Sequence, residues 1–308
     1  MDEEQSEALW RLERLDRKDQ VPSTTIEPAS YDYIRKLVRD RSGIVLEDGK
    51  EYLVEARLAP LIRREKIPTL HDLVSRLCAV PFDGLHQKVI EAMTTNETLF
   101  FRDARPFEAL RDHVLPELVS NSRDKQQLNI WCAACSSGQE PYSLAILAKE
   151  FLSAHPGWSI RILASDISAE MVARSIEGIY NQLEINRGLP APYLVKYFER
   201  QGLEWRVQDE IRQRVEFFRM NLIGTWPPLP PMDIIFLRNV LIYFDTETKK
   251  SILSKMRWLL KTEGYLFLGG AETTLYLDSG FEQVYYDKAV CYRPRHHTEK
   301  EAHAIHGK

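Results

Sequence analysis

The residues of this sequence that are best suited to chemistry are concentrated in the segment NIWCAACSSGQEPYSLAI, residues 129–146. Its two cysteines, Cys132 and Cys135, have the spacing of a redox or zinc pair. A reactive pair places its first sulfur at a helix N-terminus, whereas Cys132 falls in a segment that predicts a strand. The other cysteines, Cys78 and Cys291, are isolated, so there is no second pair of metal ligands. We therefore interpret Cys132 and Cys135 as small residues at a tight strand end and predict no metal site.

The same segment also predicts a ligand-binding loop. A strand, a run of small residues up to Gly138 and then a helix form the first strand–helix turn of a doubly wound sheet, whose ligands bind beyond the carboxyl ends of the strands. Glu140 would repel a phosphate but suits a cation, and Asp166 ends the second strand, where an acid accepts hydrogen bonds from both ribose hydroxyls. S-adenosylmethionine, which has a ribose, a positive charge and no phosphate, fits these features. A dinucleotide site, which favours Gly-X-Gly-X-X-Gly, and a purely structural turn remain open alternatives.

Strand-like and helical segments alternate from about residue 126 onward. The pattern predicts strands at 127–134, 160–167, 215–222, 232–240 and 264–270, and helices at 139–154, 168–178 and 245–260. Such alternation is typical of an α/β fold with a doubly wound parallel sheet. The last apolar segment, residues 281–293, predicts a hairpin that turns at Asp287-Lys288 and closes the sheet edge.

The part of the chain before this sheet has a different pattern. Helical periodicity predicts a small all-helical domain at 29–93, with Gly43 as a C-terminal cap and Thr69 as an N-terminal cap. We expect the remaining segments to be a charged arm, a linker with a helix that contributes to the active site, the sheet domain and a disordered tail, at 1–28, 94–125, 126–294 and 295–308.

Composition excludes several classes of protein. The chain of 308 residues has a formal net charge of −4, which does not favour a nucleic-acid-binding protein. Its apolar runs are far too short to span a membrane, and its acidic start lacks the layout of a secretory signal. We therefore expect a cytoplasmic protein, a monomer, with no nucleic-acid partner and no membrane insertion.

Four separated stretches together resemble a known family, the chemotaxis receptor methyltransferases or CheR family. They are TTNETLFFRD (94–103), CAACSSGQEPYSLAI (132–146), ASDIS with GIY (164–180) and FLRNVLIYFD (236–245). The resemblance implies a class I methyltransferase sheet, a helical N-terminal domain and a small antiparallel β-subdomain at about 200–215. It further implies methyl transfer from S-adenosylmethionine to glutamate side chains on the cytoplasmic helical bundle of chemoreceptors, with S-adenosylhomocysteine as the product.

The resemblance also implies roles for individual residues. The positions that match cofactor contacts are Asn96, Thr98, Arg102, Gly138, Glu140, Asp166, Asn221, Leu222, Arg238 and Asn239. The positions that match the catalytic centre are Arg102, Arg238 and Tyr243. An arginine there can orient a substrate carboxylate or hold the carboxylate of the cofactor. A scaffold that binds S-adenosylmethionine without catalysis, and a methyltransferase for another carboxylate, are the alternatives.

Basic residues on the second predicted helix are candidates for substrate docking. Lys50, Arg57 and Arg64 recur at spacings of seven, which places them on one stripe, and Arg63 adds charge at its end. The resemblance implies that this stripe meets an acidic receptor bundle, whereas the alternative is a solvated amphipathic helix. The segment QGLEWRVQDEIRQR, 201–214, looks too compact to grip a receptor tether, so we expect an enzyme that needs none.

Overall fold

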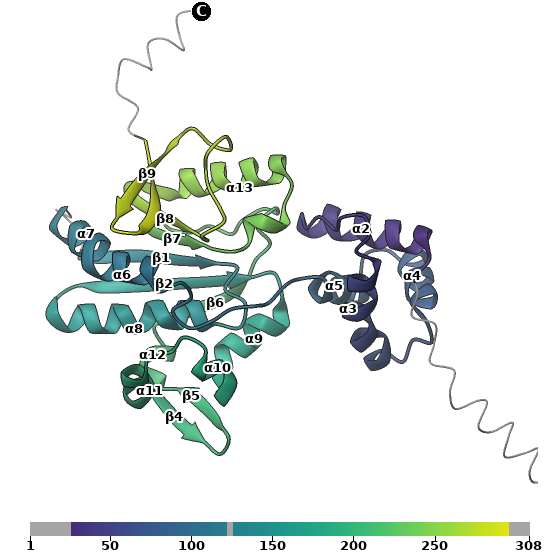
Figure 1. Cartoon of the computed structure of the whole chain (residues 1–308), viewed down its shortest axis with the longest axis horizontal. Coiled ribbons are helices and arrows are strands. Elements are labelled where there is room, and N and C mark those ends of the chain that lie inside the picture. The colour runs from purple at the N-terminus through teal and green to yellow at the C-terminus, as the bar shows by residue number, and fades with distance from the viewer. Residues whose placement is uncertain (1–25, 122–125, 296–308) are drawn as a thin grey trace, which may run out of the picture. The chain divides into compact units, whose positions relative to one another are not determined.

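The computed structural model describes residues 26–121 and 126–295, which divide into two compact units between Thr94 and Thr95 (Figure 1). The predicted C-terminal tail from 296 onward, and the predicted arm up to residue 25, lie outside the described residues. Ile26 is buried, and Pro28 begins the first described helix, so both belong to the helical unit.

The helical unit consists, in its described part, of α2 (Pro28–Ser42), α3 (Glu51–Arg64), α4 (Leu70–Ala79) and α5 (Gly84–Ala92). Aliphatic side chains at helical spacing, such as Val54 and Leu58, are fully buried and form its core. Both predicted caps are confirmed. Gly43 has a φ of 77°, and the Thr69 side chain accepts a hydrogen bond from the backbone N–H of Asp72.

The second unit is built on a seven-stranded sheet with the order β6-β2-β1-β7-β8-β10-β9. Its strands are β1 (Gln127–Ala133), β2 (Ser159–Asp166), β6 (Val215–Arg219), β7 (Met232–Leu237), β8 (Leu260–Leu268), β9 (Phe281–Tyr286) and β10 (Ala289–Pro294). The first five strands pair in parallel, and β9 and β10 form the predicted antiparallel hairpin at the edge. All six residues of β7 are buried, as expected for a central strand covered on both faces. The predicted doubly wound sheet is therefore confirmed.

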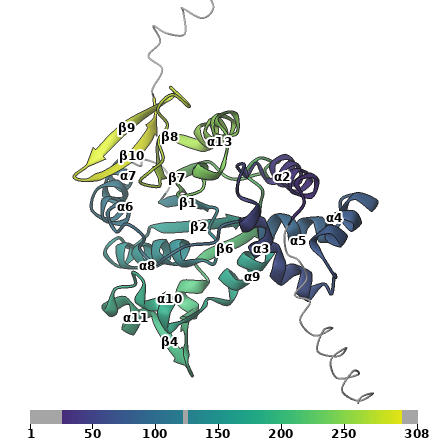
Figure 2. The same ribbon diagram turned by 45° about the vertical axis from the view of Figure 1, so that its right-hand side comes forward.

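Helices cover this sheet on both sides (Figure 1). They are α6 (Arg105–Ala109), the π-helix η1 (Leu110–Val114), α7 (Leu115–Asn121), α8 (Gln139–Ala154), α9 (Ala169–Glu177), the 3₁₀-helix η2 (Leu241–Tyr243) and α13 (Thr246–Leu259). Helices α8 and α9 pack beside β2 and β6, whereas α13 packs beside β8, an arrangement that can be followed again in Figure 2.

A small antiparallel sheet extends from the α8 side of the unit. It has the order β3-β5-β4, with β3 (Ile179–Asn181), β4 (Phe198–Gln201) and β5 (Glu204–Val207). Helices α10 (Gln182–Asn186), α11 (Ala191–Tyr197) and α12 (Asp209–Arg212) flank it. Strands β4 and β5 lie close to the range of about 200–215 that the resemblance implied, whereas β3 lies about twenty residues earlier in the chain.

Candidate active site

The loop between β1 and α8 has several residues with positive φ values, and side chains from neighbouring elements hold it in this conformation. Ala134, Ser136 and Gly138 all have positive φ values, of 59°, 50° and 96°. A β-carbon on Gly138 would lie 2.9 Å from the Tyr180 hydroxyl oxygen, so the glycine is required by space as well as by conformation. The Tyr180 hydroxyl donates to the carbonyl of Ser137, and the Ser175 hydroxyl donates to the carbonyl of Ser136. Side chains of β3 and α9 therefore fix the shape of the predicted cofactor loop.

Asp166 ends β2 directly beside this loop. Its carboxylate is buried and accepts hydrogen bonds from the backbone N–H groups of Ser136, at 2.8 Å, and Ser168, at 2.9 Å. These bonds fix the direction of the carboxylate and join the carboxyl ends of β1 and β2. The predicted ribose-binding acid therefore stands at the edge of the sheet where ligands of this fold bind.

Arg238 connects three of the four motifs. Its side chain is 1% exposed and extends from the end of β7. One Nη atom donates to Glu140 Oε2 at 2.6 Å, and the other donates to Asp103 Oδ2 at 2.7 Å and to the carbonyl of Arg102 at 2.9 Å. Within the described residues its Nε atom is buried without a hydrogen-bond partner. A buried donor of this kind is a ready contact for a ligand oxygen.

The segment with Asn96, Thr98 and Arg102 packs against the loop and α8. The carbonyl of Asn96 accepts a hydrogen bond from the Ser136 hydroxyl at 2.8 Å, and the partly buried Arg102 donates to the carbonyl of Glu97 at 3.1 Å. Thr98 is partly buried in the same segment.

The turn that follows carries unusual backbone conformations. Phe101, Asp103 and Ala104 have φ values of 49°, 64° and 26°, and the Phe101 N–H is held by the Ser143 hydroxyl at 2.9 Å. Conformations of this kind persist only where the surroundings impose them, and they are concentrated at functional sites.

Asn221 and Leu222 follow β6, the strand next to β2. The Asn221 side-chain oxygen accepts a hydrogen bond from the N–H of Ile223 at 3.2 Å, and the buried Leu222 carbonyl accepts one from the Trp226 indole at 3.0 Å. Lys255 of α13 donates to the carbonyl of Gly224 at 2.9 Å. The predicted adenine contacts therefore lie on a connection that is tied to α13.

The residues after Arg238 form a tight turn. Asn239 has a φ of 57°, and the partly buried Tyr243 ends η2. The sequence analysis missed Glu272, the residue that holds this turn. The Glu272 carboxylate accepts hydrogen bonds from the backbone N–H groups of the turn residues Asn239, Val240 and Leu241. The sequence analysis also missed Asp103. The only signal for Asp103 was its place beside Arg102 within the first motif.

The cysteine pair is part of the core of this unit. Cys132 and Cys135 are buried, and the Cys132 thiol donates to Glu140 Oε1 at 3.2 Å. Burial raises the pKa of both thiols well above their ordinary value, and the negative charges of Glu140 and Asp166 add to this effect. Thiolates, which redox chemistry requires, are therefore disfavoured. No cluster of three or more histidine, cysteine or acidic side chains suited to a metal occurs in the described ranges.

The predicted docking residues belong to the helical unit and differ among themselves. Arg63 and Arg64 are exposed at the end of α3, and Lys50 is partly buried just before its start. Arg57 is partly buried, and its guanidinium donates to the carbonyl of Met93 after α5. Arg57 therefore connects α3 to the residue that follows α5, and its docking role stays a prediction.

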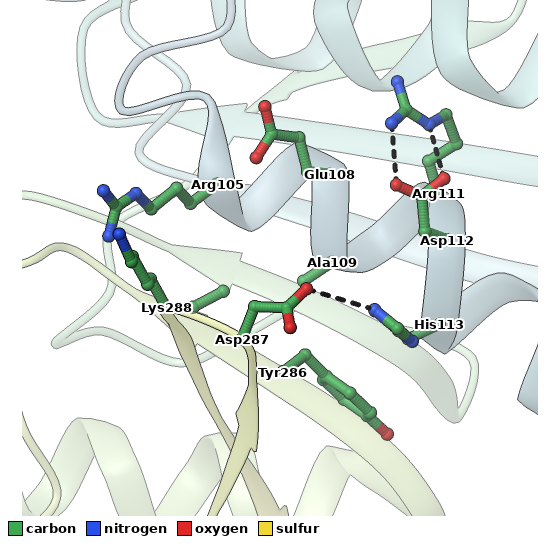
Figure 3. Close-up of a pocket in the computed structure, with 10 residues that line it drawn as sticks. Arg105, Glu108, Ala109, Arg111, Asp112, His113, Tyr286, Asp287 and Lys288 are labelled. Atoms are coloured by element: carbon green, nitrogen blue, oxygen red, sulfur yellow. Dashed lines mark hydrogen bonds and ion pairs between the residues drawn. The ribbon is translucent and has the colours of Figure 1, made fainter.

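A cavity of about 390 Å³ lies apart from the predicted cofactor residues, none of which lines it (Figure 3). It is formed by α6, η1 and the turn between β9 and β10. Arg111 pairs with Asp112, and His113 faces Asp287 at 3.8 Å.

A doubly wound α/β sheet, a glycine-containing loop after β1 and an acid at the end of β2 fit a nucleoside-binding enzyme, and Glu140 after the loop favours S-adenosylmethionine-dependent methyltransferases over dinucleotide-binding proteins. Two family models match the chain: the CheR methyltransferase SAM-binding domain over residues 96–290 and the CheR methyltransferase all-alpha domain over residues 29–94. The chain belongs to the CheR methyltransferase family. The predicted family and the predicted cofactor, S-adenosylmethionine, are both confirmed.

Curated relatives extend over most of the chain. It is 41% identical to the chemotaxis protein methyltransferase Cher2 of Pseudomonas putida, over 86% of this chain and 98% of that protein. It is also 41% identical to chemotaxis protein methyltransferase 1 of Pseudomonas aeruginosa, over 87% and 98%. The chemotaxis protein methyltransferase of Escherichia coli is 35% identical, over 83% and 88%. No helix in the described ranges is long and apolar enough to cross a membrane.

Proposed function

We propose that the protein methylates glutamate side chains on the cytoplasmic helical bundle of bacterial chemoreceptors, with S-adenosylmethionine as methyl donor. The observation that carries the proposal is the buried Arg238, which joins the ends of β7, α8 and the 101–104 turn into one site. The relatives named above are chemotaxis protein methyltransferases, which supports a receptor substrate. Glutamate methyl esters and S-adenosylhomocysteine are the expected products.

The residues present fit S-adenosylmethionine, which supplies, when bound, a methyl group on a positively charged sulfur. Glu140 is a buried carboxylate suited to the ammonium group, and Asp166 is placed at the strand end for the ribose. Asn221 and Leu222 are proposed to contact the adenine. Asn96, Thr98 and Asn239 complete the predicted cofactor contacts.

The two arginines have different environments and therefore different proposed roles. Three of the five N–H donors of Arg238 are used by Glu140, Asp103 and the carbonyl of Arg102, so Arg238 organises the site while its Nε remains for a ligand. Arg102 donates to a backbone carbonyl and has no carboxylate partner within the part of the chain that the structure describes. We assign Arg102 to a carboxylate, that of the cofactor or of the substrate glutamate.

The substrate carboxylate needs no general base. A glutamate side chain has a reference pKa of about 4.3 and is ionised at neutral pH. The protein therefore contributes orientation and exclusion of water, which can supply several kcal/mol of the barrier. Tyr243 is proposed to direct the attacking carboxylate. Tyr243→Phe removes one hydrogen bond to a charged group and should then lower turnover about tenfold while S-adenosylhomocysteine affinity changes little.

The test is methyl transfer to purified receptor cytoplasmic fragments. With methyl-labelled S-adenosylmethionine, we expect label that base releases as methanol, as a glutamate methyl ester requires, and loss of that label in Arg102→Ala. Binding of S-adenosylhomocysteine by calorimetry without any transfer would instead identify a signalling scaffold. Label on other proteins but not on receptors would identify a different carboxylate substrate.

The same assay tests whether a receptor tether is needed. Strands β4 and β5 pair from Gln201 to Glu204, so only Gly202 and Leu203 connect them. This short turn supports a tether-independent enzyme. Receptor fragments with and without their C-terminal pentapeptide should be methylated at equal rates, and a large loss on its removal would contradict this. The expected cytoplasmic location and monomeric state remain predictions.

A further inference from the structure

Glu272, in the loop after β8, is bound to the backbone of the segment that follows Arg238. Its carboxylate accepts hydrogen bonds from the N–H groups of Asn239 at 2.8 Å, Val240 at 2.9 Å and Leu241 at 2.7 Å. It also accepts one from the N–H of Gly269, at 2.7 Å. The N–H of Ile242 is a fifth donor, at 3.3 Å, so one side chain accepts from five backbone groups, four of which belong to a turn about thirty residues earlier in the chain.

This turn has no cap of its own. Residue Val240 occupies the N-cap position of η2 and offers no side-chain hydrogen bond, so the first N–H groups of the helix would lack partners. Asn239 is in the left-handed region, which asparagine adopts more readily than most other residues, and this conformation turns the chain into η2. A carboxylate at the start of a helix supplies both the missing acceptors and a favourable charge.

The contact also explains a glycine. A β-carbon on Gly269 would lie 2.7 Å from Glu272 Oε2 and 2.8 Å from the Asn239 nitrogen. Any larger residue would enter the space between the carboxylate and the turn. Gly269 and Glu272 therefore form a single arrangement, which we call the carboxylate clamp.

We propose that Glu272 is a positioning residue for methyl transfer, because the clamp sets the backbone of Asn239–Ile242 and with it the direction of Tyr243. The proposal rests on the proposed function, in which Tyr243 directs the attacking carboxylate. It assigns Glu272 no contact with substrate or cofactor. Its effect reaches the reaction through the turn alone.

The test compares Glu272→Gln and Gly269→Ala with Glu282→Gln, a change to an exposed glutamate on β9. The first two variants should lower turnover at saturating substrates by up to about tenfold, the loss expected for Tyr243→Phe, because the clamp acts through Tyr243. The calorimetric stoichiometry for S-adenosylhomocysteine should stay at one per chain in all three. Two results would overturn a positioning role. One is wild-type turnover in both clamp variants, and the other is a loss of S-adenosylhomocysteine binding together with the loss of turnover.

Two further measurements separate positioning from general loss of structure. In a Tyr243→Phe background, Glu272→Gln should lower turnover far less than in the wild type, because both changes act on the same group. Full additivity would contradict the proposal. Hydrogen exchange should show that the Val240 and Leu241 amides are protected in the wild type and lose protection in both clamp variants, and equal exchange would also contradict it. Exchange needs no substrate, so it tests the clamp even if receptor methylation itself fails.

Discussion

The charged residues that the sequence singled out have very different environments in the two units. In the sheet unit, Glu140, Asp166 and Arg238 are between 5% and 8% exposed as whole residues, and each has hydrogen-bond partners in the protein. In the helical unit, Arg63 and Arg64 are exposed at the end of α3. A buried charge is costly to leave without its partner, whereas an exposed charge is already solvated and screened by salt. The sheet unit should therefore show large effects of substitution, and the helical unit small ones that depend on salt.

The largest effect is expected at Arg238. Arg238→Met removes the cation between Glu140 and Asp103 and leaves the Glu140 carboxylate buried, which should lower the free energy of unfolding by about 3–5 kcal/mol. Urea denaturation measures it. The matched control is Arg161→Met, because Arg161 pairs with Glu216 at 2.7 Å and the two side chains are 42% and 56% exposed, so the loss there should be about 1 kcal/mol or less. Equal losses would remove the contrast between buried and exposed charge.

The next effect separates the two ends of the sheet. Asp166→Asn should weaken S-adenosylhomocysteine binding about tenfold to a hundredfold, because a hydrogen bond to a charged group is lost. Asp233→Asn is the control. Asp233 is an equally buried aspartate at the start of β7, bonded to Lys261 at 2.7 Å. Asp233→Asn should lower the free energy of unfolding and leave the calorimetric affinity for S-adenosylhomocysteine unchanged. An affinity loss of the same size at Asp233 would mean that Asp166 acts through the fold.

The buried thiols should make stability depend on pH. Because burial raises the pKa of Cys132 well above its ordinary value, the folded chain keeps this proton to higher pH than the unfolded chain does. The stabilisation is full below about pH 8.5 and is lost as the pH rises through the folded pKa. As the pH rises from about 7.5 to about 9.5, the free energy of unfolding of Cys132→Ala should fall by roughly 1 kcal/mol less than that of the wild type, as measured by urea denaturation. Cys78→Ala, at an exposed thiol, should follow the wild type.

The smallest effect is expected in the helical unit. The double variant Arg63→Glu, Arg64→Glu should raise the KM for receptor fragments about threefold at low salt. This increase in KM should disappear at high salt, and the affinity for S-adenosylhomocysteine should not change. Arg76→Glu, an exposed change on α4, is the control for net charge. Arg57 is left out because it holds the Met93 carbonyl. An effect that persists at high salt would point to contacts other than charge.

Several parts of the site could be predicted because they follow from local pattern. Apolar segments end at Ala133, Asp166 and Leu237, and parallel strands bring their carboxyl ends to one edge. Glu140 was predicted from its place after the loop and Arg238 from the family resemblance, and the structure joins the two by a hydrogen bond of 2.6 Å. The stripe on α3 was less reliable, since a spacing of seven shows which residues share a face but not which face turns inward.

By itself, the sequence determined the order of strands and helices, the family and the residues that meet at the edge of the sheet, because these depend on periodicity and on motifs continuous in the chain. Only the tertiary structure decided that Arg238 bonds to Asp103 and that Glu272 holds the turn before Tyr243. The physical reason is that these contacts join segments far apart in the chain, and those of Glu272 end on backbone N–H groups. Every residue except proline carries such a group, so it leaves no mark in the sequence.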